Sequence, residues 1–189
     1  MSRISLKKTD FVNLIIYYQK GEISALEELL KRIQKNVYTM FSYLARDSQD
    51  VSDMTQEVLI RVAKGLKSLN EPSNFKSWLN HIVTNVFFDF GRKNSAEKNI
   101  DHDEDKLLAL RDKIGCEPGE KCLFSEIDRI IKMALINLPK NLRIAIILRE
   151  YEGLSYEDIS KITNTTLGTV KSRISRARLK LQNELKDFI

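Results

Sequence analysis

The sequence contains few of the residues that interrupt helices or cross-link a chain. Its 189 residues include seven glycines, three prolines and two cysteines. Because long stretches hold neither glycine nor proline, the chain favours helices over hairpins and tight turns. No run approaches about 18 apolar residues, and the first segment, MSRISLKKTD, lacks the apolar centre of a signal peptide. We therefore predict an all-α protein of the cytoplasm that does not insert into a membrane.

The scarce cysteines and histidines do not form a reactive or metal-binding pattern. Cys116 and Cys122 match no common zinc spacing, and no histidine lies close enough in sequence to complete one. We predict reduced thiols with structural or incidental roles. The two histidines, His81 and His102, lie in different segments, and no HExxH, phosphate-binding loop or Ser/His/Asp arrangement is apparent. The sequence therefore argues against an enzyme, and we predict no cofactor.

Apolar residues recur at helical spacing in two parts of the chain, on either side of a polar segment. The first part holds four helical patterns, with a break at Pro72 before the last one. We expect Thr9 to cap the first helix, a Ser24–Glu27 capping box to open the second and Gly91 to end the fourth. The expected helices form a small bundle and cover residues 10–19, 24–45, 51–69 and 74–91.

The second part predicts a shorter helical unit that ends in a helix-turn-helix. A periodic segment over 126–136 is followed by a helix with Pro139 in its first turn. Ser155 is expected to cap the next helix, and Thr165 the last one, after a short turn. Two short helices joined by a turn of this length are typical of DNA-binding proteins.

Residues 94–122 differ from both flanking parts. The stretch NSAEKNIDHDEDK is polar and mostly acidic towards its end, and the later GCEPGEK contains two glycines and a proline. Such segments are typical of flexible linkers. We predict two small helical modules, residues 1–93 and 123–189, joined by a linker with one short helical turn near 107–110.

The last predicted helix has a distinctive distribution of charge. The stretch GTVKSRISRARLK carries five basic residues and no acid, and the net charge of the chain is +5. At about 100° per residue, Gly168, Ser172 and Ser175 fall on one strip between two basic flanks. The apolar residues fall on the opposite face: Leu167, Val170, Ile174, Ala177, Leu181 and Leu185.

This distribution suits a DNA groove better than bulk solvent. Small residues let a helix backbone approach base edges, while long basic side chains reach the phosphates on both sides. A solvated helix more often alternates Glu with Lys, because such pairs stabilise it. The pattern therefore predicts a DNA-reading helix.

Two parts of the sequence resemble the sigma-70 family of bacterial RNA polymerase sigma factors, and its compact extracytoplasmic-function (ECF) group in particular. The segment LPKNLRIAIILREYEGLSYEDISKITNTTLGTVKSRISRARLKL is similar to region 4, which reads the promoter minus-35 element. The segments DVSDMTQEVLIRV and NFKSWLNHIVTNVFFDFGRK resemble region 2, which contacts polymerase and handles the minus-10 element. The resemblance implies sigma-2 and sigma-4 modules that bind core RNA polymerase and promoter DNA without covalent chemistry. It also implies an anti-sigma partner, which is common in the group.

The resemblance further implies roles for individual residues. The polymerase-binding residues are Asp53, Gln56, Glu57 and Ile60. The minus-10 residues are Asn85, Phe87, Phe88, Arg92 and Lys93. The minus-35 residues are Thr165, Thr166, Thr169, Lys171, Ser172, Arg173, Ser175, Arg176 and Arg178. Asn85 would hold an unstacked base, one of the two phenylalanines would support the site, and Arg173 and Arg178 would meet phosphates or pair within the module.

Some positions depart from the family pattern. His81 and Thr84 stand where family members often carry Arg, and Ser175 stands where a bulky aromatic residue or His is common. The preferred minus-35 sequence is therefore not predicted.

A conventional helix-turn-helix regulator is the alternative interpretation. It would use residues 1–92 as a sensor domain and would bind DNA without polymerase, usually as a dimer.

Overall fold

The computed structural model describes the backbone of residue 6 and of residues 9–97 and 120–186, and side chains in these ranges except 93–97 and 120–125. Within these residues the chain is helical and has no strand, which confirms the predicted all-α class. The predicted acidic run, the helical turn near 107–110 and Cys116 lie outside the described residues. The side chain of Cys122 lies outside them as well.

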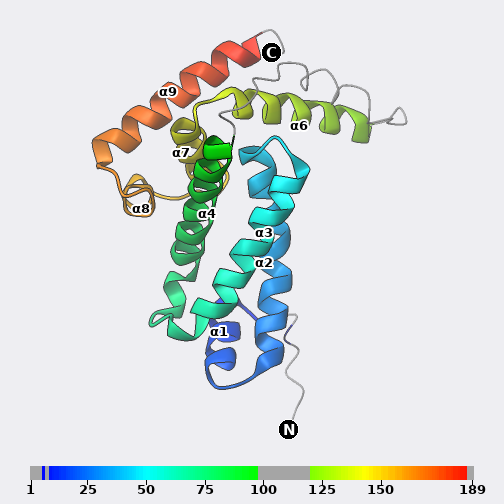
Figure 1. Ribbon diagram of the computed structural model, residues 1–189, viewed down its shortest axis with the longest axis vertical. Coiled ribbons are helices and arrows are strands. Elements are labelled where there is room, and N and C mark those ends of the chain that lie inside the picture. Colours follow the sequence, from blue (N-terminus) through cyan, green and yellow to red (C-terminus); the bar gives the residue numbers. More distant parts are fainter. Residues whose placement is uncertain (1–5, 7–8, 98–119, 187–189) are drawn as a thin grey trace.

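The first four helices form the N-terminal bundle. They are α1 (Phe11–Gln19), α2 (Ile23–Leu44), α3 (Ser48–Gly65) and α4 (Phe75–Glu97). Two 3-10 turns, η2 (Leu66–Ser68) and η3 (Pro72–Asn74), connect α3 to α4. Helices α2, α3 and α4 lie side by side, and α1 lies at the end where the α3–α4 connection turns (Figure 1). Their shared core holds fully buried side chains such as Leu29, Phe41 and Val58.

Several predicted helix ends in this bundle are wrong by a few residues. Asp10 caps α1 instead of Thr9, because its carboxylate accepts a hydrogen bond from the Asn13 backbone N–H at 2.7 Å. The predicted capping box does not form, because α2 starts at Ile23 and Ser24 already lies inside the first turn.

The predicted end of α4 is also wrong, and the reason is backbone conformation. A glycine ends a helix when it turns left-handed, as Gly21 does after α1 with a φ of +102°. Gly91 has no positive φ, so α4 continues through it to Glu97.

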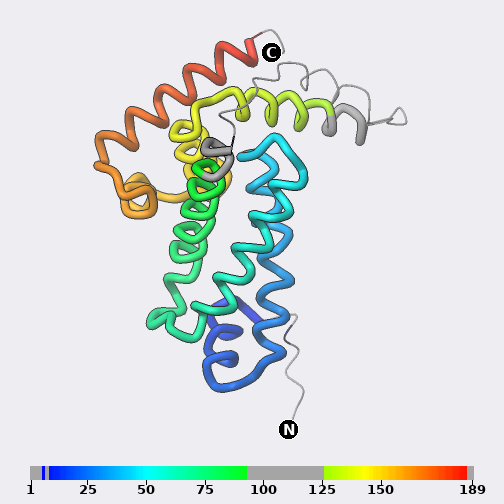
Figure 2. The backbone as a smooth tube through the Cα atoms, viewed as in Figure 1, coloured from blue at the N-terminus to red at the C-terminus, as the bar shows by residue number. Residues whose placement is uncertain are grey.

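The remaining helices form the C-terminal unit. They are α6 (Glu120–Asn137), α7 (Lys140–Glu150), α8 (Tyr156–Ile162) and α9 (Leu167–Leu185). Ser155 caps α8 as predicted, since its Oγ accepts from the Asp158 backbone N–H at 3.0 Å. Pro139 is the cap of α7 and does not lie in its first turn. The chain doubles back after α8, so that α9 runs along the outer edge of the unit (Figure 2).

The two units pack directly against each other. Helix α2 contacts α6 and α7, and α4 contacts α8. The hydroxyl of Tyr43 in α2 donates to the Asp128 carboxylate in α6 at 2.7 Å, and Lys132 Nζ lies 5.2 Å from the centre of the Tyr43 ring. The sequence predicted two modules but did not predict this contact between them.

Candidate nucleic-acid interface

The burial of α9 agrees with the face predicted from its sequence. Val170, Ile174 and Ala177 are at most 1% exposed and pack against the rest of the C-terminal unit. On the opposite side, Gly168, Ser172, Ser175 and Leu179 are exposed. The outer strip of α9 is therefore made of small residues and one leucine.

Two threonines at the start of α9 have different environments. Thr166 is the N-cap, since its Oγ1 accepts from the Thr169 backbone N–H at 3.2 Å, and the two hydroxyls lie 2.9 Å apart. The predicted cap, Thr165, is half-buried, and its hydroxyl lies 2.9 Å from that of Thr163. Thr166 and Thr169 thus lie at the exposed helix start, where hydroxyl and backbone N–H groups can meet an anion.

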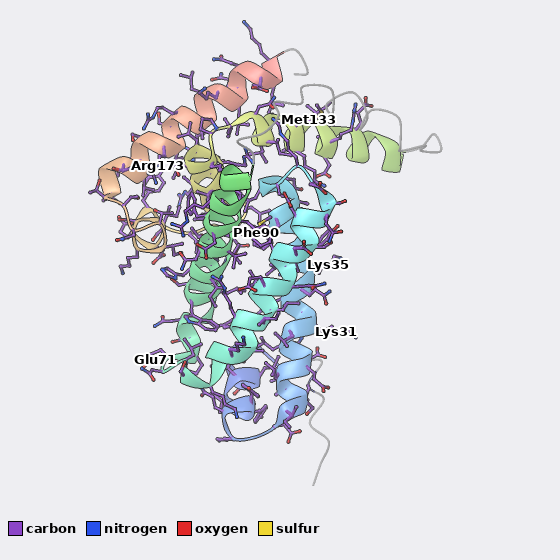
Figure 3. All side chains as sticks on the ribbon, in the orientation of Figure 1. Lys31, Lys35, Glu71, Phe90, Met133 and Arg173 are labelled. Atoms are coloured by element: carbon purple, nitrogen blue, oxygen red, sulfur yellow. The ribbon has the colours of Figure 1, made fainter. Side chains whose placement is uncertain are left out.

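The basic residues of α9 divide into exposed and partnered side chains. Lys171 is exposed, and Arg173, which is labelled on α9 in Figure 3, is half-buried. Arg176 donates to the Ser172 backbone carbonyl and hydroxyl, both at 3.2 Å, which holds it along the small-residue strip. Arg178 pairs with Glu150 of α7 at 2.6 Å, and this hydrogen bond raises the pKa of Arg178. Pairing within the module is one of the two roles predicted for Arg178.

Helix α4 places the predicted minus-10 residues at different depths. Asn85 is exposed, and its Nδ2 lies 3.1 Å from Nδ1 of His81 one turn earlier. Phe87 is 5% exposed and belongs to the core, whereas Phe88 is half-buried with its ring 5.6 Å from that of Phe87. Phe87 can therefore act on a bound strand only by supporting Phe88.

The end of α4 carries the two predicted basic residues. Arg92 is exposed and pairs with Asp89 one turn earlier. The side chain of Lys93 lies outside the described residues.

Helix α3 presents the predicted polymerase-binding residues on an exposed face. Asp53 and Gln56 are exposed, and Ile60 is 47% exposed despite its apolar side chain. Glu57 is half-buried and pairs with Arg61 at 2.7 Å, and Arg61 also reaches Asp89 of α4 at 3.3 Å. The hydrogen bond to Glu57 is the main cause that raises the pKa of Arg61. The face combines polar groups with one exposed isoleucine, as interfaces often do.

Polar residues that no sequence pattern predicted join the two units. Arg143 of α7 is 9% exposed and donates to the backbone carbonyls of Ile136, Leu138 and, across the units, Leu44. Burial, together with the nearby charge of Arg46, lowers the pKa of Arg143 to about 10. The only sign of this buried role in the sequence is that Arg143 lies between apolar neighbours, in the stretch LRIAIIL.

A second polar group between the units lies where α4 meets the α7–α8 turn. Lys76 Nζ donates to the Glu152 backbone carbonyl at 2.6 Å, and Asn80 Nδ2 donates to the Glu152 carboxylate at 3.2 Å. Asn80 and Thr84 are 3% and 1% exposed. In the sequence, this contact is indicated by polar residues at helical positions of α4 that face inward.

The described residues hold no group of three or more His, Cys, Asp or Glu side chains that could bind a metal ion. In the same part of the chain, every helix is too short or too polar to cross a membrane.

Comparisons with known proteins agree with this geometry. Residues 29–97 match the family described as Sigma-70 region 2, and residues 128–181 match Sigma-70, region 4. The ECF RNA polymerase sigma-E factor of Haemophilus influenzae is 35% identical over 184 residues, which cover 93% of this chain and 95% of the relative. The protein of the same description from Escherichia coli K12 is 34% identical, with 98% and 99% of the two chains covered.

Two solved structures are also similar. The sigma factor RpoE in complex with the anti-sigma factor NepR from Bartonella quintana superimposes with a TM-score of 0.66 and 28% identity, covering 85% of this chain and 96% of that one. CnrH in complex with the cytosolic domain of CnrY has a TM-score of 0.65 at 20% identity, covering 94% and 97%, and therefore supports the fold alone.

The N-terminal bundle matches region 2, and the helix-turn-helix unit that follows it matches region 4, which is the order of these regions in sigma factors. This combination defines a sigma factor. The chain belongs to the sigma-70 family, and within it to the ECF type. It is therefore a transcription initiation factor and not an enzyme, and its partners are core RNA polymerase and promoter DNA.

Proposed function

We propose that this ECF sigma factor divides promoter recognition between its two units, with α4 serving the minus-10 element and α9 the minus-35 element. The observation that carries the proposal is the outer strip of α9, where Ser172 and Ser175 lie exposed while the inner face is buried. A strip of small residues with basic flanks fits a major groove about 12 Å wide. The protein acts in the cytoplasm, where polymerase and chromosome are found.

In the minus-35 half, some residues position the helix on the DNA and others read the base sequence. Exposed Lys171, together with Thr166 and Thr169 at the helix start, supplies contacts to phosphates, which set the register of the helix. Ser172, Ser175 and Arg176 face the base edges. Thr165, Arg173 and Arg178 act at the border of this surface, either on phosphates or within the module.

In the minus-10 half, Asn85 holds an unstacked base of the non-template strand. Its exposed amide on α4 supports this role, because extruding a base costs a few kcal/mol that hydrogen bonds and stacking must offset. Phe88 lies close enough to the surface to stack, with Phe87 below it. Arg92 and Lys93 attract the phosphates that follow.

The proposed sigma-2 module covers residues 1–93, the linker 94–122 and the sigma-4 module 123–189. Asp53, Gln56, Glu57 and Ile60 on α3 form the polymerase contact of the first module. An anti-sigma factor is a further proposed partner, because the similar structure of RpoE is a complex with the anti-sigma factor NepR.

Run-off transcription tests the function. Core polymerase with this protein should initiate at promoters upstream of its own operon, and core polymerase alone should not. If the protein instead binds paired half-sites as a dimer and adds no initiation, it is a conventional regulator and the proposal is wrong.

One variant tests the minus-10 assignment within that assay. Asn85→Ala should reduce open-complex formation about 10- to 100-fold, because a good base contact contributes roughly 1–3 kcal/mol. Asn36→Ala, an exposed asparagine within α2, is the matched control and should leave initiation unchanged. Equal activity of the two variants would remove Asn85 from the site.

A further inference from the structure

The packed arrangement of the two units excludes simultaneous reading of both promoter elements. The minus-10 and minus-35 elements lie about 25 base pairs apart, or roughly 85 Å along a duplex at 3.4 Å per base pair. Helix α4 has 23 residues and is therefore only about 35 Å long, and it touches α8 directly. The C-terminal unit must leave α4 before both elements can be bound.

That departure removes Glu152 from the first members of a row of polar side chains on α4. We call Lys76, Asn80 and Thr84 the α4 polar stripe, since they follow one another at intervals of four residues. Asn80 and Thr84 are almost fully buried, and the Thr84 hydroxyl has no hydrogen-bond partner. A buried hydroxyl without a partner is unfavourable, so this surface suits a contact with water or a polar ligand better than permanent burial.

The group that covers the stripe is an anion. Glu152 of the α7–α8 turn places its carboxylate 3.2 Å from Asn80 Nδ2 and 3.8 Å from Lys76 Nζ, and its side chain is 17% exposed. The other amide N–H of Asn80 donates to the Lys76 carbonyl at 3.1 Å, which orients the side chain towards the carboxylate. The stripe therefore already forms an oriented pair of donors for an oxyanion.

We propose that the α4 polar stripe is a phosphate-binding site for promoter DNA, and that Glu152 occupies it in place of a DNA phosphate while the units are packed together. This inference rests on the proposed promoter-binding function. Thr84 lies about 60° around the helix from His81, which contacts Asn85, so the stripe borders the surface assigned to the minus-10 strand. Asn80 donates to the phosphate oxygen, Lys76 supplies the positive charge, and Thr84 gains the hydrogen-bond partner that it lacks.

The competition follows from the nature of the two contacts. Lys76 is 63% exposed and its Nζ lies 3.8 Å from the Glu152 carboxylate, so this ion pair is weak and screened by salt, whereas the shorter contact of Lys76 is its 2.6 Å hydrogen bond to the Glu152 backbone carbonyl. A DNA phosphate offers the same charge together with the release of bound counterions. DNA therefore displaces Glu152, and the displacement favours the separated units.

The test uses two variants that break the same ion pair and have opposite expected effects. Holoenzyme assembled from core polymerase and the full chain is titrated onto a promoter fragment at several salt concentrations. Glu152→Gln should strengthen promoter binding about 3-fold, whereas Lys76→Gln should weaken it about 5-fold and lower the salt slope by roughly one. The double variant should bind more weakly than wild type, because it lacks the phosphate contact of Lys76 just as the single variant Lys76→Gln does.

Controls separate this inference from simpler effects of charge. Lys31→Gln and Glu27→Gln change exposed residues of α2 and should keep the wild-type salt slope (Figure 3 labels Lys31). Affinity for core polymerase is measured in parallel, and a loss there with Lys76→Gln would mean that the stripe binds polymerase instead of DNA. If Lys76→Gln strengthens promoter binding as Glu152→Gln does, the pair only holds the units together and the inference is wrong. If wild-type holoenzyme initiates no more than core polymerase, the proposed function itself fails.

Discussion

The two helices assigned to DNA differ in how much of their polar surface is free. On α9, Lys171, Ser172 and Ser175 are exposed on a face opposite the buried one. On α4, Asn80 is buried and donates to Glu152 of the C-terminal unit, and Thr84 is buried one turn further along the helix. Helix α9 is therefore ready to meet DNA as it stands, whereas on α4 Asn85 and Arg92 are exposed but the start of the α4 polar stripe must first be freed from Glu152.

This difference indicates an order of events. A helix with a free surface can make the first contact, while a helix covered by its own chain responds only after the cover has moved. The packed state is a real competitor for α4, because its contacts are specific polar ones as well as apolar packing.

Removing Arg143 should have the largest effect on the contact between the two units. Arg143→Ala leaves three carbonyls without their charged donor, one of them on the N-terminal bundle. We expect the free energy of unfolding to fall by roughly 3 kcal/mol, since hydrogen bonds to charged groups contribute about 1.5–3 kcal/mol each and water satisfies some of the freed groups. Urea denaturation measures the loss, and small-angle scattering should show the units further apart.

Arg149→Ala is the matched control on the same helix. Arg149 donates to the Leu154 carbonyl at 2.7 Å and lies 4.8 Å from the centre of the Tyr156 ring, so these contacts stay within the C-terminal unit. Arg149→Ala should lower the free energy of unfolding by about 1 kcal/mol and leave the scattering profile unchanged. Equal scattering by both variants would contradict the role of Arg143 in holding the units together.

Two residues on the exposed side of α9 should respond differently to substitution. Arg178→Ala should weaken holoenzyme binding to the same degree on every minus-35 sequence and lower the salt slope by roughly one. Ser172→Ala should instead change which sequence is preferred, by about 1 kcal/mol at a single base pair. Binding to a panel of minus-35 variants distinguishes the two, and uniform losses for Ser172→Ala would refute its base-reading role.

The smallest expected effect is spectroscopic. Burial, followed by the hydrogen bond to Asp128, raises the pKa of Tyr43 to about 12. A raised pKa contributes stability that is complete below the ordinary tyrosine pKa of about 10 and is lost as the pH rises through about 12. Because Asp128 belongs to the other unit, the late ionisation of Tyr43 reports that the units are packed.

Near-ultraviolet absorbance after rapid pH jumps measures that ionisation. Asp128→Asn should move the latest tyrosine ionisation to lower pH, while Tyr38→Phe, which removes an exposed tyrosine of the same helix, should leave it in place. No change with Asp128→Asn would mean that the hydrogen bond between the units does not form in solution.

Sequence periodicity predicted the faces of the helices but not the way in which the units meet. The buried and exposed sides of α9 follow from spacing alone, because a helix of this length must bury its apolar stripe. The cap was misplaced by one residue because Thr165 and Thr166 have equal capping chemistry. The contacts of Asn80 with Glu152 join residues 72 positions apart, and no local pattern encodes such a pair.

For the site residues as well, the sequence did not predict the contacts that depend on tertiary packing. Asn85 and Ile60 were assigned from the family resemblance, and the structure places both side chains at exposed positions. Phe87 and Phe88 are adjacent in sequence, and only the packing of α4 determines which ring is buried. The pairing of Arg178 with Glu150 of another helix likewise depends on tertiary structure.

The contact between α4 and the α7–α8 turn joins parts of a single chain, and this sets its dependence on concentration. An intramolecular contact has an effective concentration fixed by the chain that connects its two halves, so dilution does not open it. Doubling the amount of the protein in a cell would leave the fraction of packed molecules unchanged. A competing ligand, a change of salt or pH, or a change in the chain itself can shift that fraction.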